Sequence, residues 1–255
     1  MFNFTGRVAI VTGSGSPHGM GRETVMCLAE CGCNVVIADI DYDGACRNAK
    51  EAEAFGVKAL PVKVDATDRS SVDTMVQQVI DTFGKIDILV NIAGMTSPAK
   101  TIDITYEQFD KMMKINLYTV FNCTQAVLPY MIKQQYGRII NLSSVSAKRG
   151  GGVFGGSHYS ASKAAIMGFA KNLAREVVTD HITVNNICPG LIATDFRRTA
   201  TGLSDEDERK LWEDVPLKRP GTPREVAAAI VFLASDEAAF ITGEEIDVNG
   251  GAHID

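Results

Sequence analysis

The chain alternates short apolar runs with longer stretches in which apolar residues recur every three or four positions. Six runs rich in Val and Ile predict buried strands, namely RVAIVT, NVVIAD, VKALPVKV, IDILVN, GRIINLS and ITVNNIC, and EEIDVN predicts a seventh. The stretches between them predict helices at 21–31, 42–55, 70–83, 105–133, 159–178 and 223–234. Repeated β–α units predict an α/β fold with a parallel sheet and helices on both faces.

One segment, at about 195–216, interrupts this alternation. It contains the acidic stretch SDEDERK, which predicts the start of a solvated helix with Ser204 as its N-cap. Segments that interrupt a scaffold commonly carry function, so we expect a loop or lid over a substrate here. No Pro- or Ser-rich linker divides the 255 residues, and the sequence therefore predicts a single domain over 1–255.

Composition and charge limit the classes of protein to which this chain can belong. Hydrophobic residues make up 45% of the chain, which suits a large core, and the net charge of −6 without a Lys or Arg run argues against a nucleic-acid partner. No apolar run approaches the ~20 residues of a membrane helix, and no basic stretch opens a signal peptide, so we expect a cytoplasmic protein. Six scattered cysteines without ligand spacing predict reduced thiols and no metal site: Cys27, Cys31, Cys33, Cys46, Cys123 and Cys188.

The stretch VAIVTGSGSPHGMGRETV, residues 8–25, has the pattern of a strand, a glycine-rich turn and a helix start. It does not fit the spacing G-x-G-x-x-G, because His18 and Thr24 stand where a third glycine would fall. Its glycines still let the backbone approach a pyrophosphate at a helix N-terminus. The residues expected to do so are Gly13, Gly19, Met20 and Gly21. From this stretch alone, a plain glycine-rich turn remains an alternative.

Asp39 ends the second predicted strand, 18 residues after Gly21. An acid at about this distance suits the hydroxyls of an adenosine ribose and would repel a 2′-phosphate, which favours NAD over NADP. The alternative is an Asp that only caps a helix. Residues at the ends of the third and fourth strands extend the same edge and leave room for a cofactor: Asp65, Ala66, Asn91, Ala93 and Gly94.

The stretch YSASK places Tyr159 and Lys163 four residues apart, on one face of a helix. A phenol acts as a base near neutral pH only when a nearby cation favours its anion, and Lys163 is such a cation. Ser144 ends the fifth strand, where a hydroxyl can bind a substrate oxygen, and Ser143 competes with it because alternation lets only one face the site. Asn116 lies mid-helix, where a buried amide needs polar partners.

In this order, TGSGSPHGMG, NIAG, INLSSVS, YSASK, ICPGLIATDF and FITGEEIDVNGG make the whole chain resemble a short-chain dehydrogenase/reductase. The resemblance implies a Rossmann-type, doubly wound sheet of seven strands and oxidation of an alcohol or reduction of a carbonyl with NAD(P). It also implies a catalytic tetrad: Asn116, Ser144, Tyr159 and Lys163. Ser144 is preferred to Ser143 because family members usually place the catalytic Ser before a small apolar residue, here Val145.

The resemblance further implies a role for each residue of the tetrad. Tyr159 exchanges a proton with the substrate, Ser144 orients the substrate oxygen, and Lys163 binds the nicotinamide ribose and lowers the pKa of Tyr159. Asn116 holds a water in a proton relay. The nicotinamide end is expected to contact Pro189, Gly190, Ile192 and Thr194. A homotetramer is implied as well, with contacts through helices 105–133 and 159–178 and the C-terminal helix and strand.

The chain departs from the family pattern in three places. Five residues separate Gly13 from Gly19, two more than usual, and we predict that Ser16, Pro17 and His18 bulge outward beside the adenosine ribose or pyrophosphate. Ile92 replaces the second Asn of the usual NNAG and is expected to pack under the sheet. The 15 positions from Ser144 to Tyr159 are about two more than is common.

These departures leave the substrate open among secondary alcohols, polyols, steroids and 3-oxoacyl thioesters. The expected pocket residues are Met95, Arg149, Phe154, His158, Leu191 and Phe196. Arg149 can meet an anionic substrate or be a solvated charge, and His158 can line the pocket or lie exposed at a helix start. The leading prediction is an NAD-dependent oxidoreductase acting on a secondary alcohol or ketone. The alternatives are an NADP-dependent 3-oxoacyl thioester or carbonyl reductase, a dehydratase or epimerase, and a catalytically silent dinucleotide-binding regulator.

Overall fold

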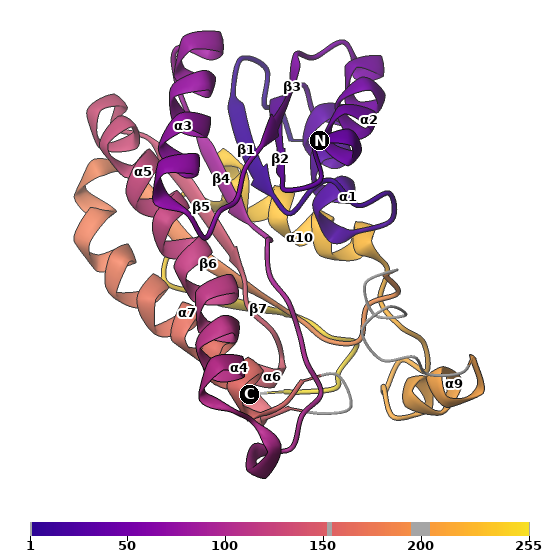
Figure 1. The fold of residues 1–255 in the computed structure, drawn as a ribbon. Coiled ribbons are helices and arrows are strands. Elements are labelled where there is room, and N and C mark those ends of the chain that lie inside the picture. The colour runs from indigo at the N-terminus through magenta and orange to yellow at the C-terminus, as the bar shows by residue number, and fades with distance from the viewer. Residues whose placement is uncertain (1, 152–154, 195–204, 255) are drawn as a thin grey trace.

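A seven-stranded parallel sheet forms the centre of the computed structural model, which describes residues 2–151, 155–194 and 205–254 (Figure 1). The strands are β1 (Val8–Thr12), β2 (Asn34–Asp39), β3 (Ala59–Lys63), β4 (Ile88–Asn91), β5 (Gly137–Leu142), β6 (Ile182–Pro189) and β7 (Glu245–Val248). Their order is β3-β2-β1-β4-β5-β6-β7. All residues of β1, β4, β5 and β6 are buried, which explains why these strands are rich in apolar residues and show no alternation with exposed polar ones. The predicted α/β fold of Rossmann type is confirmed.

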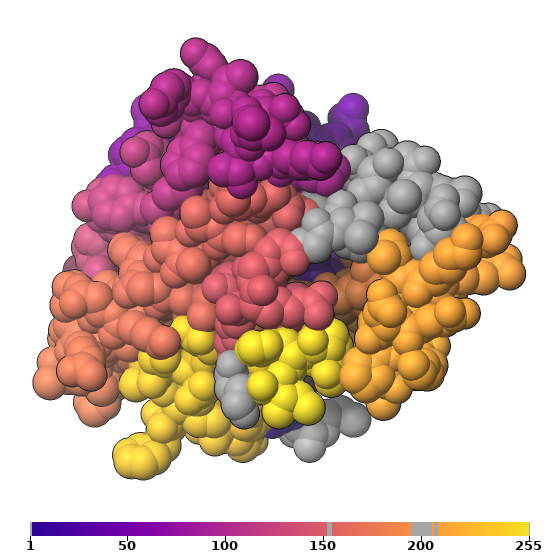
Figure 2. All heavy atoms as spheres, turned by 90° about the horizontal axis from the view of Figure 1, so that it is seen from below, coloured from indigo at the N-terminus to yellow at the C-terminus, as the bar shows by residue number. Residues whose placement is uncertain are grey.

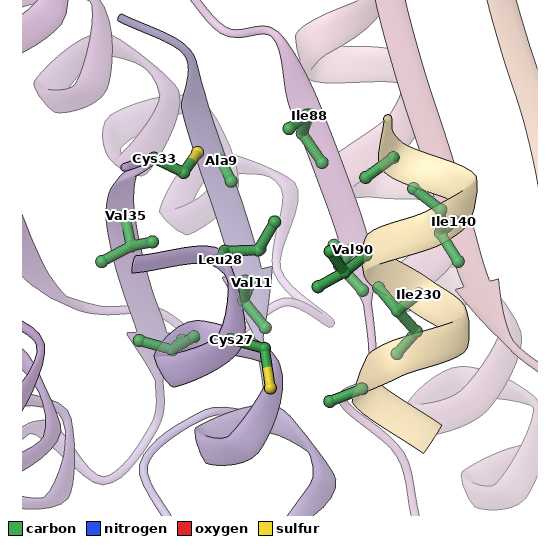
Figure 3. Packing of buried hydrophobic residues seen from close by; sticks show 14 of the residues in the cluster. Ala9, Val11, Cys27, Leu28, Cys33, Val35, Ile88, Val90, Ile140 and Ile230 are labelled. Atoms are coloured by element: carbon green, nitrogen blue, oxygen red, sulfur yellow. The ribbon is translucent and has the colours of Figure 1, made fainter. Parts of the chain in front are cut away.

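Helices cover both faces of the sheet. On one face lie α1 (Met20–Glu30), α2 (Tyr42–Ala52) and α10 (Pro223–Ala234), and Figure 3 shows Leu28 of α1 and Ile230 of α10 among side chains of β1 and β4. On the other face lie α3 (Arg69–Phe83), α5 (Thr119–Gln134) and α7 (Ser157–Val177), which contribute Val76, Val127 and Ala170 to a second core cluster. Two apolar layers therefore fix the strands, and their carboxyl ends are left to form a site.

The strand order reverses beside β1. The chain runs outward from β1 through β2 to β3, then returns to β4 on the other side of β1 and continues to β7. The loops that leave β1 and β4 therefore diverge, which opens a crevice beyond the carboxyl ends of these two strands.

The helix predicted over 105–133 is three segments. A Thr105–Gln108 capping box starts α4 (Tyr106–Met113), a π-helical turn spans Lys114–Tyr118, and α5 follows. The wider turn carries Asn116, which is buried and bonded to the backbone of Met95. Pairing with a distant loop, which the local pattern does not encode, accompanies this change of helix type.

Smaller differences concern helix ends and short helices. The helix predicted over 42–55 ends at Ala52 and continues as a 3₁₀ turn, Glu53–Phe55, and the helix predicted from 159 begins at Ser157. Helix α6 (Ser146–Arg149) and 3₁₀ turns at Thr101–Asp103, Val178–Asp180 and Asp236–Ala238 complete the connections. The six cysteines are all free. Among the described residues, none of the helices has the length and apolar character needed to cross a bilayer.

The acidic segment contains helix α9 (Asp205–Glu213), while the predicted N-cap Ser204 lies outside the described residues. Figure 2 shows the described part of this segment, from Asp205 on, in orange beside the C-terminal residues in yellow. Leu217 N donates to Gly250 O at 3.3 Å, so the end of the segment is joined to the turn after β7. A lid function for 195–216 stays a prediction.

Candidate active site

A cavity of about 1000 Å³ lies at the crevice. It joins the end of β2 at Asp39 to the end of β5 and the start of α7. Most of the predicted site residues line it: Gly13, Gly19, Met20, Gly21, Asp39, Asp65, Ala66, Ala93, Gly94, Met95, Ser144, Arg149, Tyr159, Lys163, Pro189, Gly190, Leu191, Ile192 and Thr194. Residues from distant parts of the sequence therefore form one wall.

The glycine-rich turn brings backbone to this wall. Gly13 has φ 67°, and a Cβ there would lie 2.8 Å from the Ala93 Cα, so a side chain is excluded on both counts. Helix α1 starts with Gly19 as its N-cap and has no side-chain capping bond, which leaves its first N–H groups for an anion. Pro17 and His18 are exposed, whereas Ser16 is half-buried and lines the cavity, and the predicted bulge of these three residues beside the adenosine ribose or pyrophosphate stays a prediction.

Asp39 reaches back to the turn. Its Oδ2 accepts a hydrogen bond from Gly15 N at 2.7 Å, and its Oδ1 accepts one from Asp41 N at 3.0 Å. The N-cap of α2 is Asp41, which accepts from Gly44 N at 3.1 Å, so the alternative of Asp39 as a helix cap is wrong. The residues present fit a dinucleotide, because an uncapped helix start and a carboxylate line the same cavity.

At the other end of the cavity, Tyr159 lies in the first turn of α7. Its hydroxyl is hydrogen-bonded to Ser144, and burial raises the pKa of Tyr159 while that bond acts in the opposite direction. Ser143 also lines the cavity, but its Oγ donates to Lys163 O at 3.0 Å. Ser144 Oγ accepts from Ser146 N at 3.1 Å, which fixes the hydroxyl beside Tyr159.

Lys163 follows one helical turn after Tyr159. Its Nζ donates to Leu142 O at 2.6 Å, and burial lowers the pKa of Lys163 to about 8. In this arrangement the ammonium is bound to the end of β5 and burial is the main influence on the Tyr159 pKa, so the lowering of that pKa by Lys163 stays a prediction.

Asn116 supports this end without lining the cavity. Its Oδ1 accepts from Met95 N at 2.7 Å, and its Nδ2 donates to Met95 O at 3.0 Å and to Ser162 Oγ at 2.9 Å. The side chain therefore ties the loop after β4 to α7, between Tyr159 and Lys163 in sequence. Its role in a proton relay stays a prediction.

Comparisons with known proteins agree with this geometry. A family model described as Enoyl-(Acyl carrier protein) reductase matches residues 13–253. An uncharacterized short-chain type dehydrogenase/reductase, y4mP of Sinorhizobium fredii, is 42% identical over 98% of both chains. The 3-oxoacyl-[acyl-carrier-protein] reductases FabG of Thermotoga maritima and Escherichia coli are 39% and 38% identical, over 98% and 99% of both chains respectively.

A solved structure gives the same result. The crystal structure of a short-chain type dehydrogenase/reductase from Mycobacterium marinum superposes with a TM-score of 0.92 and 32% identity, covering 100% of this chain and 98% of that one. The chain belongs to the short-chain dehydrogenase/reductase family. It is therefore an oxidoreductase of a family that binds a nicotinamide dinucleotide.

Besides Asn116, two predicted site residues of this short-chain dehydrogenase/reductase do not line the cavity. Asn91 donates from Nδ2 to Asn141 Oδ1 at 2.9 Å and to Thr124 Oγ1 at 3.3 Å, so it links β4 to β5 and α5 instead of facing a cofactor. The residue after it, Ile92, packs in the core as expected and also lines the cavity. Successive side chains of an extended chain point in opposite directions, which explains why Ile92 and not Asn91 lines the cavity.

His158 is the second correction. It neither lines the cavity nor lies exposed, since only 1% of it is accessible, and burial lowers its pKa. The loop after β4 is bonded to the start of α7 just before His158, with Gly156 N donating to Ser97 O at 2.9 Å and Thr101 Oγ1 to Ser157 Oγ at 3.0 Å. Phe154 and Phe196 lie outside the described residues.

Other residues at this dehydrogenase site escaped sequence reasoning. Arg47 and Asn48 of α2 bond to the glycine-rich turn. Asn48 stands in the buried row of α2 that also contains Ala45, Ala49 and Ala52. A buried amide needs hydrogen-bond partners, and this requirement was the sequence signal that could have identified Asn48. Asp214 and Ala252 also line the cavity, but they are brought there only by the packing of the C-terminal segments.

Proposed function

We propose that this protein is an NAD-dependent oxidoreductase that interconverts a secondary alcohol and a ketone. The observation that carries the proposal is the single cavity lined by Asp39 at one end and by the hydrogen-bonded Tyr159 and Ser144 at the other. When bound, the nicotinamide would supply or accept the hydride.

The chain's own residues handle the proton and the substrate oxygen. Burial keeps Tyr159 protonated, which suits a phenol that donates to the oxygen of a carbonyl being reduced. Ser144, bonded to the same hydroxyl, polarises and orients that oxygen. Lys163 carries the cation that favours the tyrosinate when the proton moves the other way, and it binds the nicotinamide ribose. Asn116 fixes Met95 at the wall of the cavity and, in the proposal, holds a relay water.

Asp39 supports the choice of NAD. A carboxylate accepts hydrogen bonds from ribose hydroxyls and repels a 2′-phosphate. Both oxygens are held by backbone amides, so the charge stays at this wall of the cavity. Fluorescence titration should give tighter binding of NADH than of NADPH. Equal or tighter binding of NADPH would overturn the preference.

A second candidate is an NADP-dependent 3-oxoacyl thioester reductase. It is favoured by the printed names of the Thermotoga maritima and Escherichia coli relatives and by cationic residues of the cavity wall, Lys111 and Arg149. Arg149 Nη1 donates to Ala252 O at 3.0 Å, which holds this cation at the wall. Turnover of acetoacetyl-coenzyme A with NADPH at a higher rate than any alcohol with NAD would select this candidate.

The proposal is tested with a panel of alcohols and NAD, read at the absorbance band of NADH. For any substrate found, Tyr159→Phe should lower turnover by about a thousandfold and leave NADH binding unchanged. Tyr106→Phe, which alters an exposed tyrosine of α4, serves as the matched control. Turnover that survives Tyr159→Phe contradicts the mechanism. A protein that binds NADH and turns over no alcohol, carbonyl, dehydratase or epimerase substrate would be the catalytically silent regulator.

Assembly and location extend the proposal. We expect a homotetramer with contacts on α4, α5, α7 and the C-terminal helix and strand, and exposed aromatic side chains on α4 and near the start of α5 suit such a contact: Tyr106, Phe109, Tyr118 and Phe121. A light-scattering mass near 27.4 kDa would reject the tetramer. A cytoplasmic location is part of the same proposal.

A further inference from the structure

The enlarged glycine-rich turn is bonded to one helix through three consecutive carbonyls. Asn48 Nδ2 donates to Ser14 O at 2.6 Å and to Ser16 O at 3.1 Å, and Arg47 Nη2 donates to Gly15 O at 2.8 Å. Two neighbouring side chains of α2 therefore hold the first half of the turn that carries the two additional residues.

Close contact between α2 and the turn depends on Gly44. A Cβ at this position would lie 2.3 Å from Gly15 O, so only glycine lets the first turn of α2 approach so near. Asn48, one helical turn later, is 0% exposed, and its Oδ1 has no hydrogen-bond partner. A buried amide oxygen without a partner costs free energy that an apolar side chain would avoid. The Nδ2 group of Asn48, which donates to Ser14 O and Ser16 O, is therefore the part of the side chain that accounts for an amide at this position.

The same peptide segment holds Asp39. Gly15 receives Arg47 at its carbonyl and donates its N–H to Asp39 Oδ2 at 2.7 Å. The position of that N–H depends on the segment that α2 holds. Release of the turn would remove this bond and leave the Asp39 carboxylate held through Oδ1 by Asp41 N, with more freedom to rotate away from its place at the cavity wall.

We propose that Arg47 and Asn48 are positioning residues that clamp the turn at residues 14–16 and thereby hold Asp39 where it excludes a 2′-phosphate. The proposal rests on the NAD preference argued above. It makes discrimination between the two dinucleotides a property of α2 as well as of the carboxylate itself.

A purely structural role for these contacts predicts something different. It would lower stability, or weaken NADH and NADPH equally, and it would leave the ratio of their dissociation constants unchanged. The ratio is therefore the readout that separates the two roles.

The experiment uses the full chain with Asn48→Leu, which keeps the side-chain size and removes the donor, and Arg47→Met, which keeps the stem and removes the guanidinium. Lys50→Met is the matched control, because it removes a cation from an exposed position on the same helix. Arg47→Lys retains a donor and should restore the wild-type values. Dissociation constants of NADH and NADPH are measured by fluorescence, those of ADP-ribose by calorimetry, and thermal midpoints are recorded for every variant.

We expect the ratio of the NADPH to the NADH dissociation constant to fall by about tenfold in Asn48→Leu and by several-fold in Arg47→Met. Lys50→Met and Arg47→Lys should keep the wild-type ratio. An unchanged ratio in both clamp variants, or an equal change in Lys50→Met, overturns the proposal. If Asn48→Leu does not fold, Arg47→Met decides, because Arg47 is exposed.

The NAD preference itself is tested by the wild-type protein, independently of the clamp variants. A wild-type protein that binds NADPH as tightly as NADH overturns that preference and also the role of the clamp in discrimination. ADP-ribose affinity then decides whether the clamp positions the turn at all. A roughly tenfold loss in Asn48→Leu relative to Lys50→Met supports that part, and equal affinities reject it.

Discussion

The two ends of the sheet each bury a long cationic side chain, and they treat it in opposite ways. Arg138, near the start of β5, and Lys163, bonded to the end of β5, are both 4% exposed. About 13 Å of strand, or four residues, separates Arg138 from Leu142. The charge of Arg138 is surrounded by hydrogen-bond and ion-pair partners, whereas the charge of Lys163 is not.

Arg138 belongs to a cluster that joins several elements. Its guanidinium donates to the backbone oxygens of Gly137 and His181, at 2.9 and 3.3 Å, and lies 3.4 Å from Asp236 Oδ1. Arg138 and Arg7 both stack on the ring of Tyr136, at 4.4 and 3.7 Å from its centroid. Every polar atom of the arginine faces a partner that keeps its place in the folded chain.

Lys163 has a single bond, to Leu142 O. Within the described part of the chain, no carboxylate pairs with its ammonium, and burial lowers its pKa to about 8. The difference predicts that Arg138 stabilises the fold, whereas burial of the Lys163 charge costs stability, in keeping with the proposal that this charge serves a ligand. Two matched substitutions, each of which replaces one of these cations by Met, test this difference.

Lys163→Met should have the largest effect, and on turnover alone. We expect a loss of about a thousandfold for any substrate, because the cation that favours the tyrosinate is gone. The free energy of unfolding at pH 7 should not fall, since removing a buried charge offsets the lost bond to Leu142 O. Initial rates and urea unfolding measure the two quantities. A marked loss of stability would mean that Lys163 is structural like Arg138.

Arg138→Met should show the reverse. Loss of the guanidinium leaves buried backbone oxygens and the Tyr136 ring without their partner, and we expect destabilisation by about 3 kcal/mol in urea unfolding. The dissociation constant of NADH should stay unchanged, because the cluster lies at the other end of the strands. Weaker NADH binding at full folding would contradict the separation of the two ends.

The smallest effect concerns pH. The folded pKa of Lys163, about 8, lies below its ordinary value of 10.5, so the unfolded chain binds more protons between these two values. Stability contributed by this group therefore rises as the pH rises through that window. Relative to Lys163→Met, the wild type should gain roughly 2 kcal/mol between pH 7 and pH 10, whereas its difference from Arg138→Met should stay nearly constant. Urea unfolding of the wild type and of Lys163→Met at both pH values measures this change in relative stability. A wild type that loses stability relative to Lys163→Met between pH 7 and pH 10 would refute the prediction.

Sequence reasoning predicted the sheet, and most of the site residues that it predicted line the cavity, because both depend on local patterns. Val and Ile runs gave the strands, and the residues that follow a parallel strand must lie at its carboxyl edge, as Gly13, Asp39 and Ser144 do. It failed where a side chain's direction depends on a distant segment. Asn91 is bonded to Asn141 of the neighbouring strand, and His158 is buried beside the point where the loop after β4 is bonded to α7.

The amino-acid sequence by itself determined the β–α alternation, the glycine turn with Asp39 after β2, and the spacing of Tyr159 and Lys163. Each of these follows from residues close together in the chain, where periodicity and backbone sterics act. Only the tertiary structure decided that Asn48 and Arg47 hold the turn, that Asn116 sits in a π-helical turn bonded to Met95, and that Lys163 is buried with no carboxylate partner among the described residues. These outcomes depend on hydrogen bonding and desolvation between segments far apart in sequence, which no local pattern encodes.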